Sequence, residues 1–177
     1  MRLFVALDLP DNVAVQLTQM QGGVTGARWC SRQQLHLTLR FIGNADARET
    51  AAIGDALAVV RHQHFQLEIQ GVGTFGAAVP RELWAGISPN DALTAVQRRI
   101  DEVLQRVGLA PERRTFTPHV TLARLKAAPR DMVREFLASH ARHASGPFEV
   151  GAFVLYSSEL TPRGSVYERQ RTYPLLV

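Results

Sequence analysis

The sequence predicts an α+β fold in which two similar sheet-and-helix lobes, related by a pseudo-twofold axis, enclose a central cleft. The first observation is the segment 35–41, in which apolar and polar residues alternate and which contains His36 and Thr38. The second is the return of this His-x-Thr pattern as His119-Val120-Thr121. Alternation with a period of two is typical of a half-buried strand, so each histidine shares a strand face with its threonine. Two such strands can build one site.

The residues around the two motifs repeat in the same order. The repeat covers about residues 1–78 and 81–160, and residues 83–91 align with residues 3–11 at aromatic, apolar, proline and acidic positions. Units with this order of strands and helices favour mixed or antiparallel sheets with helices on one face. We therefore expect a single two-lobed domain over residues 1–177, in which the open faces of the two middle strands look at each other across the cleft.

The first half contains strand and helix signals in alternation. A strand is expected over residues 2–9, and Pro10-Asp11-Asn12 supplies cap residues for a helix over 13–21 that three nearby glycines end. The His-x-Thr strand ends at Gly43-Asn44, and Asp46 begins a helix over 47–61. An apolar stretch over 65–75 predicts the last strand of this half.

The second half follows the same plan. A strand begins at Leu83, and a helix over 92–107 with an apolar stripe that includes Val107 is ended by Gly108. The second His-x-Thr strand follows, and Pro129 precedes a helix over 130–142. We expect one strand over 148–156, equivalent to 65–75, and a closing strand over 165–175.

Composition excludes several classes of protein. The net charge is +4 and the only cysteine is Cys30, so neither an internal disulfide nor a cysteine metal cluster can form. The pair His62 and His64 lacks an evident third metal ligand. No apolar run approaches the roughly 18 residues of a membrane span. These features predict a cytoplasmic protein, and the lack of an obvious exposed apolar stripe favours a monomer.

The two His-x-Thr motifs, together with segments 2–10 and 35–43, resemble those of the two-histidine phosphoesterases. Within that superfamily the chain is most similar to the bacterial RNA 2',3'-cyclic phosphodiesterases, also called 2'-5' RNA ligases. The resemblance implies a bilobal α+β fold, a cleft between the lobes, and no metal or nucleotide cofactor. It also implies hydrolysis of RNA 2',3'-cyclic phosphate ends, tRNA fragments among them, to 2'-phosphomonoesters. ATP-independent 2'-5' ligation, in which a 5'-hydroxyl replaces water, is a further implied activity.

The resemblance also implies a role for individual residues. His119 is expected to accept the proton of water and His36 to donate a proton to the departing 3' oxygen; imidazoles suit both tasks because their ordinary pKa lies near 6.5. Thr38 and Thr121 are the expected phosphate ligands, and Arg124 matches a further one. On a regular strand Arg124 would face away from the site, so it needs a bulge or an early strand end to reach the phosphate.

Two alternatives stay open from the sequence. The substrate could instead be a small cyclic nucleotide or an ADP-ribose cyclic phosphate. A non-catalytic module that binds RNA ends could keep the same cleft. Two retained histidines favour the enzyme, because binding alone could use arginine.

Overall fold

The computed structural model describes all 177 residues as nine strands, four α-helices and one short 3-10 helix. In chain order the elements are β1 (Arg2–Asp8), α1 (Asp11–Met20), β2 (Ala27–Trp29), η1 (Arg32–Gln34), β3 (His36–Asn44), α2 (Ala47–Leu57), β4 (Phe65–Phe75), β5 (Glu82–Ile87), α3 (Asp91–Arg106), β6 (His119–Leu125), α4 (Arg130–His140), β7 (Ala144–Val150), β8 (Ala152–Thr161) and β9 (Gly164–Pro174). The α+β class is confirmed.

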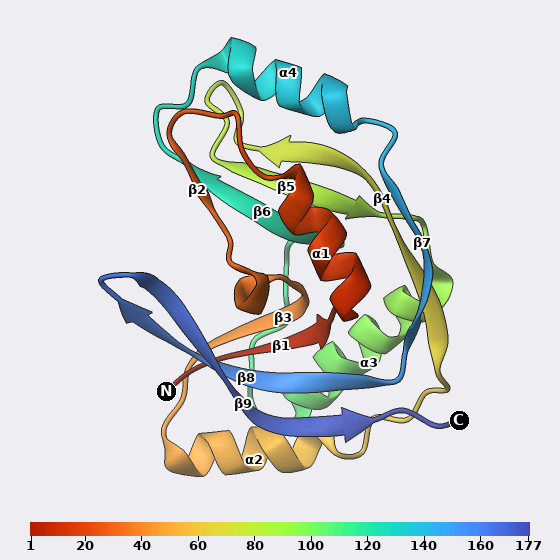
Figure 1. Ribbon diagram of the computed structural model, residues 1–177. Helices are drawn as coiled ribbons and strands as arrows, with labels where there is room; N and C mark the ends of the chain where they lie inside the picture. Colours follow the sequence, from red (N-terminus) through yellow and green to blue (C-terminus); the bar gives the residue numbers. More distant parts are fainter.

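The strands form two antiparallel groups that join at a narrow seam. The order is β7-β4-β5-β6-β3-β1-β8-β9, and β2 adds to β6. The two groups meet where β3 pairs with β6 at one residue pair, Leu37 with Val120. The lobes diverge on either side of this seam (Figure 1). The middle strands of the two lobes therefore lie edge to edge at the seam, where the sequence had suggested two sheets facing each other.

Each lobe takes strands from both halves of the sequence repeat. Strand β4 belongs to the first half but pairs with β5 and β7. Strand β8 belongs to the second half but pairs with β1 and β9. The expected single strand over 148–156 is wrong for this reason: the chain leaves one lobe after Val150, passes Gly151 and enters the other lobe at Ala152.

Helix α2 begins directly after Asp46 as predicted, whereas α1 begins at Asp11, before the expected residue 13, and has no side-chain cap. Asp46 and Glu49 form a reciprocal capping box at the start of α2, and the Asn90 side chain accepts a hydrogen bond from the Leu93 amide at the start of α3. Helix α2 ends at Leu57, before the expected residue 61, because residues 58–60 form a tight turn of i to i−3 hydrogen bonds that leads into β4. Helix α3 ends at Arg106, and Gly108 follows with a φ of +100°.

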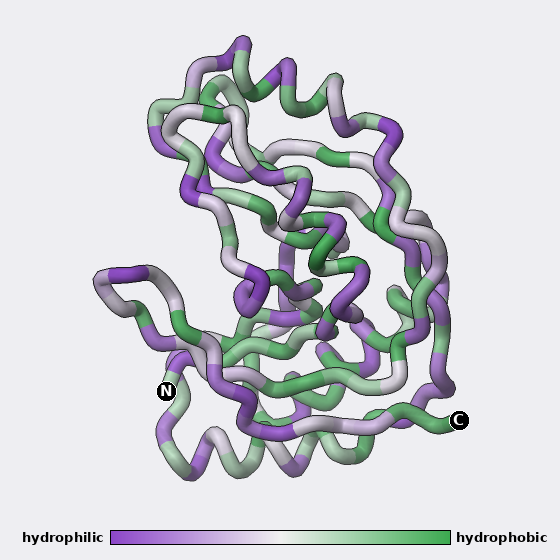
Figure 2. Tube along the Cα trace, in the orientation of Figure 1, coloured by the Kyte–Doolittle hydropathy of each residue, from purple (hydrophilic) through white to green (hydrophobic).

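A continuous apolar core supports both lobes. It contains 37 buried residues, and the stripe of α3 contributes Leu93, Val96, Ile100, Val103 and Leu104 to it. Val107, expected on the same stripe, is 41% exposed because it lies beyond the helix end. Figure 2 shows the hydrophobic residues concentrated in the central strands, whereas hydrophobic and hydrophilic residues alternate along the helices. None of the helices has the length and apolar character needed to cross a membrane.

The seam gives a test of the fold. Leu37 is fully buried opposite Val120, so the substitution Leu37→Ala is expected to lower the free energy of unfolding by about 2 to 5 kcal/mol. Urea unfolding followed by circular dichroism measures this change. The control is Leu160→Ala, because Leu160 is 79% exposed and its loss should cost less than about 0.5 kcal/mol. Equal costs for both variants would contradict a packed seam.

Candidate active site

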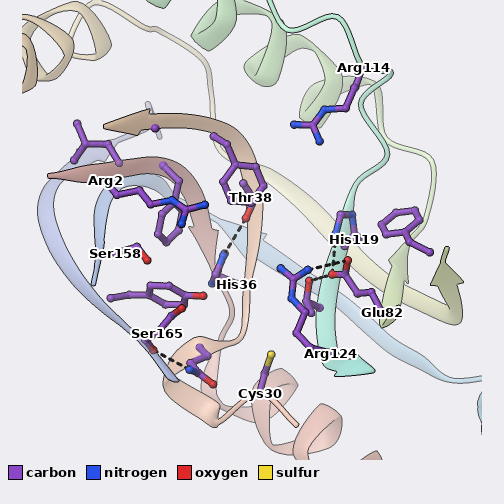
Figure 3. A pocket seen from close by; sticks show the side chains of 18 residues that line it. Arg2, Cys30, His36, Thr38, Glu82, Arg114, His119, Arg124, Ser158 and Ser165 are labelled. Carbon is purple, nitrogen blue, oxygen red and sulfur yellow. Dashed lines mark hydrogen bonds and ion pairs between the residues drawn. The ribbon is translucent and has the colours of Figure 1, made fainter. Parts of the chain in front are cut away.

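A pocket of about 540 Å³ opens at the seam between the lobes. Its lining includes all five site residues expected from the sequence: His36 and Thr38 from β3, and His119, Thr121 and Arg124 from β6. In Figure 3 the two histidines project from their separate strands toward the same open space. The pairing of β3 with β6 at Leu37 and Val120 produces this arrangement, because the residues flanking those two buried side chains must point to the opposite face.

His36 lies in an aromatic environment. Its ring centroid is 4.9 Å from that of Phe4 and 5.1 Å from that of Tyr167, and its Nε2 lies 3.0 Å from Thr38 Oγ1. Burial lowers the pKa of His36 to about 4, although a hydrogen bond to the Gln34 backbone and the charge of Asp8 act in the opposite direction. The charge of His119 contributes to the lowering. His36 is therefore neutral in the free protein near pH 7.

His119 is held by a backbone carbonyl and by two aromatic rings. Its Nδ1 lies 2.7 Å from the Thr117 carbonyl oxygen, a contact that requires a proton on Nδ1, so Nε2 is the ring nitrogen that can gain or lose a proton in the pocket. The Phe75 ring meets it edge-on at 4.8 Å between centroids, and Trp84 lies 6.2 Å away. Gly73 makes room for the Trp84 ring, since a Cβ there would approach it to 2.2 Å.

Arg124 reaches the pocket through a bulge in β6. Strand β5 pairs Leu83 with Ala123 and the next residue, Trp84, with Thr121, so Leu122 is an extra residue on β6. Leu122 and Ala123 are both buried, and the residue after them returns to the pocket face. The bulge that the sequence required for Arg124 is thus present.

Strand β3 has the equivalent bulge. Strand β1 pairs Val5 with Arg40 and then Ala6 with Thr38, which leaves Leu39 as the extra residue. Phe41 consequently stands in the first motif where Arg124 stands in the second, and both line the pocket. The two halves of the site share a backbone plan but carry different side chains.

Glu82 is a pocket residue that the sequence analysis missed. It is 8% exposed; one carboxylate oxygen, Oε1, accepts a hydrogen bond from Thr121 Oγ1 and lies 3.7 Å from His119 Nε2. The other oxygen, Oε2, is 3.6 Å from Arg124 Nη1. A signal existed, because Glu82 is a charged residue directly before the apolar start of a strand, at the same parity as Trp84.

Further basic and aromatic residues lie partly in the pocket and partly outside it. Arg2, Phe4, Arg114 and Tyr167 line the pocket. Arg169 and Arg171 form ion pairs with Asp8 and Asp55 outside it, and Arg113 and Arg163 do not line it. His64 pairs with Glu149, and no group of three or more His, Cys, Asp or Glu side chains is placed to hold a metal ion.

Known proteins are similar to this chain in both sequence and fold. The model of a family described as the 2'-5' RNA ligase superfamily matches residues 9–162. An RNA 2',3'-cyclic phosphodiesterase from Archaeoglobus fulgidus is 30% identical over 177 residues, which cover 98% of this chain and 99% of that protein. The protein of the same name from Thermotoga maritima is 31% identical over 176 residues and covers 95% and 92%.

Two solved structures have nearly the same fold. A protein from Thermus thermophilus superposes with a TM-score of 0.81 at 27% identity, covering 98% of this chain and 97% of its own. LigT from E. coli in its apo form gives a TM-score of 0.81 at 24% identity, covering 99% and 98%. At that identity the second similarity concerns the fold alone. The bilobal fold expected from the two motifs is confirmed.

The environment of His36 predicts a pH-dependent contribution to stability. Its pKa rises from about 4 in the folded protein to about 6.5 on unfolding, so between these values the unfolded chain binds more protons and stability falls as the pH falls. Relative to a His36→Gln variant, the wild type should lose about 2 to 3 kcal/mol more unfolding free energy between pH 7.5 and pH 4.5. Urea unfolding at both pH values measures this difference. A difference that does not change with pH would contradict a half-buried imidazole that is neutral near pH 7.

Proposed function

The chain belongs to the 2'-5' RNA ligase superfamily, and we propose that it hydrolyses RNA 2',3'-cyclic phosphate ends to 2'-phosphomonoesters. Relatives that match over nearly their full length are RNA 2',3'-cyclic phosphodiesterases. The observation that carries the proposal is the placement of His36 and His119, from separate strands, in one pocket with a threonine beside each. A cyclic phosphate needs a base on one side of phosphorus and an acid on the other, and two imidazoles supply both.

In this proposal His119 is the proton acceptor. Its Nδ1 is occupied by the Thr117 carbonyl, so the lone pair of Nε2 is available to take a proton from the attacking water. His36 is the proton donor to the departing 3' oxygen. Because the pKa of His36 is low in the free protein, the ring has to gain its proton when the substrate binds, and the negative charge of the phosphate favours this protonation.

Thr38, Thr121 and Arg124 are the proposed phosphate ligands. In the free protein the Thr38 hydroxyl lies against His36 Nε2, and the Thr121 hydroxyl donates to Glu82. Both hydroxyls have to turn toward the non-bridging oxygens when the substrate binds. A donor placed in this way contributes roughly 2 to 4 kcal/mol to lowering the barrier.

The same site accounts for joining as well as hydrolysis. A 5'-hydroxyl in place of water would open the strained ring and form a 2'-5' bond without ATP. The proposed partners are cytoplasmic RNA ends that carry a 2',3'-cyclic phosphate, for example those of tRNA fragments. A monomer suffices for this chemistry, since one chain supplies all five proposed residues.

Substitution of either histidine tests the mechanism. His36→Asn and His119→Asn should each lower kcat/KM for an RNA with a 2',3'-cyclic phosphate end by about 10²-fold to 10⁴-fold, because each removes one proton transfer. Initial rates in the presence of EDTA provide the measurement, and wild-type turnover is expected to persist there. His62→Asn is the matched control, since His62 lies outside the pocket.

The identity of the product tests the two roles separately. Protonation of the 3' oxygen leaves a 2'-phosphate, which phosphorus NMR of the reaction mixture distinguishes from a 3'-phosphate. A 3'-phosphate would reverse the assignment of donor and acceptor. Loss of wild-type activity in EDTA would instead contradict a mechanism carried by the two imidazoles.

A further inference from the structure

Glu82 places a negative charge where an anion has to bind. It is the only acidic residue among the 18 that line the pocket, whereas Arg2, Arg114 and Arg124 are basic. Its carboxylate contacts three groups of the second motif: the Thr121 hydroxyl, His119 Nε2 at 3.7 Å and Arg124 Nη1 at 3.6 Å. Figure 3 shows these interactions converging on its two oxygens.

The strand pairing in this lobe does not need a carboxylate at this position. Glu82 pairs with Arg124 across β5 and β6, as Phe4 pairs with Phe41 across β1 and β3. The same backbone position in the other half of the site therefore carries an apolar ring. Since the fold accepts a phenylalanine there, the presence of Glu82 calls for an explanation in the chemistry of the pocket.

The carboxylate competes with phosphate for the same ligands. A threonine hydroxyl has a single proton, so Thr121 donates either to Glu82 or to a phosphate oxygen. The Arg124 guanidinium is likewise shared between the carboxylate and any phosphate that binds beside it. Glu82 also repels each negative charge that the phosphate carries, and this repulsion grows with the charge of the ligand.

Substrate and product differ in this charge. A 2',3'-cyclic phosphate is a diester with one negative charge, whereas its hydrolysis product is a monoester whose second ionisation has a pKa of about 6. Near pH 7.5 the product therefore carries close to two charges. Resting on the proposed function, we propose that Glu82 is a specificity-determining residue that favours the singly charged cyclic diester over the doubly charged monoester and thereby promotes product release.

Neutralising Glu82 tests this selection. In Glu82→Gln the residue keeps its shape and an acceptor for Thr121, but the charge is lost. At pH 7.5 the variant should bind adenosine 2'-monophosphate about tenfold to a hundredfold more tightly than the wild type, measured by isothermal titration calorimetry. The KM for adenosine 2',3'-cyclic phosphate should fall by only about threefold to tenfold, because a single charge feels half of the repulsion energy that two charges feel.

Two further variants make the result specific. Glu82→Val, which imitates the apolar residue of the other half, should also tighten monoester binding. Glu135→Gln removes the same charge from the exposed face of α4 and should leave both ligands unaffected. Thermal unfolding of every variant shows that the comparison is made between folded proteins.

The outcomes separate this inference from the proposed function. Unchanged or weaker monoester binding in both Glu82 variants would overturn the selection, as would equal tightening of monoester and cyclic diester. A wild-type protein that does not turn over the cyclic diester would overturn the proposed function. The calorimetric measurement on the monoester needs no turnover and would still test Glu82.

Discussion

The whole site depends on one backbone pair, Leu37 with Val120, at which the edge strands of the two lobes meet. Both side chains are fully buried, so their neighbours in sequence must point to the opposite face. This constraint alone brings His36 and Thr38 to the same pocket as His119 and Thr121. The seam is narrow because the lobes diverge on either side of it, and their divergence opens the space that a phosphate needs. Packing of apolar residues thus fixes the chemistry of the polar ones.

The two halves of the site share a backbone but differ in electrostatics. Equivalent bulges at Leu39 and Leu122 return the chain to the pocket face, where they present Phe41 in one half and Arg124 in the other. Their cross-strand partners differ too: Phe4 pairs with Phe41, and Glu82 pairs with Arg124. Both imidazoles contact aromatic rings, but burial holds His36 neutral, while His119 lies beside a carboxylate. A duplicated scaffold has become an asymmetric site through single side chains.

Local patterns predicted most of the elements, and the two motifs with their family resemblance indicated the five pocket residues, but neither showed how the halves combine. Alternation in 35–41 and 119–123, and the cap at Asp46, are short-range signals that one sequence displays directly. The exchange of β4 and β8 between lobes depends on long-range pairing, which leaves no period in the chain. The division at Gly151 follows from that exchange and was missed for the same reason. Glu82 was missed because its partners, Thr121 and Arg124, are about forty residues away.

The asymmetry gives the proposed reaction a direction. In the free protein His36 is neutral and the Glu82 carboxylate contacts Thr121, a proposed phosphate ligand, so we expect the pocket to bind an anion of high charge weakly. The single negative charge of the cyclic diester favours protonation of His36. In this proposal it also competes only weakly with Glu82 for Thr121 and Arg124. Ring opening then adds a second negative charge beside Glu82, where repulsion is greatest. In this proposal the residues that admit the substrate also disfavour the product, because the product carries more negative charge beside Glu82.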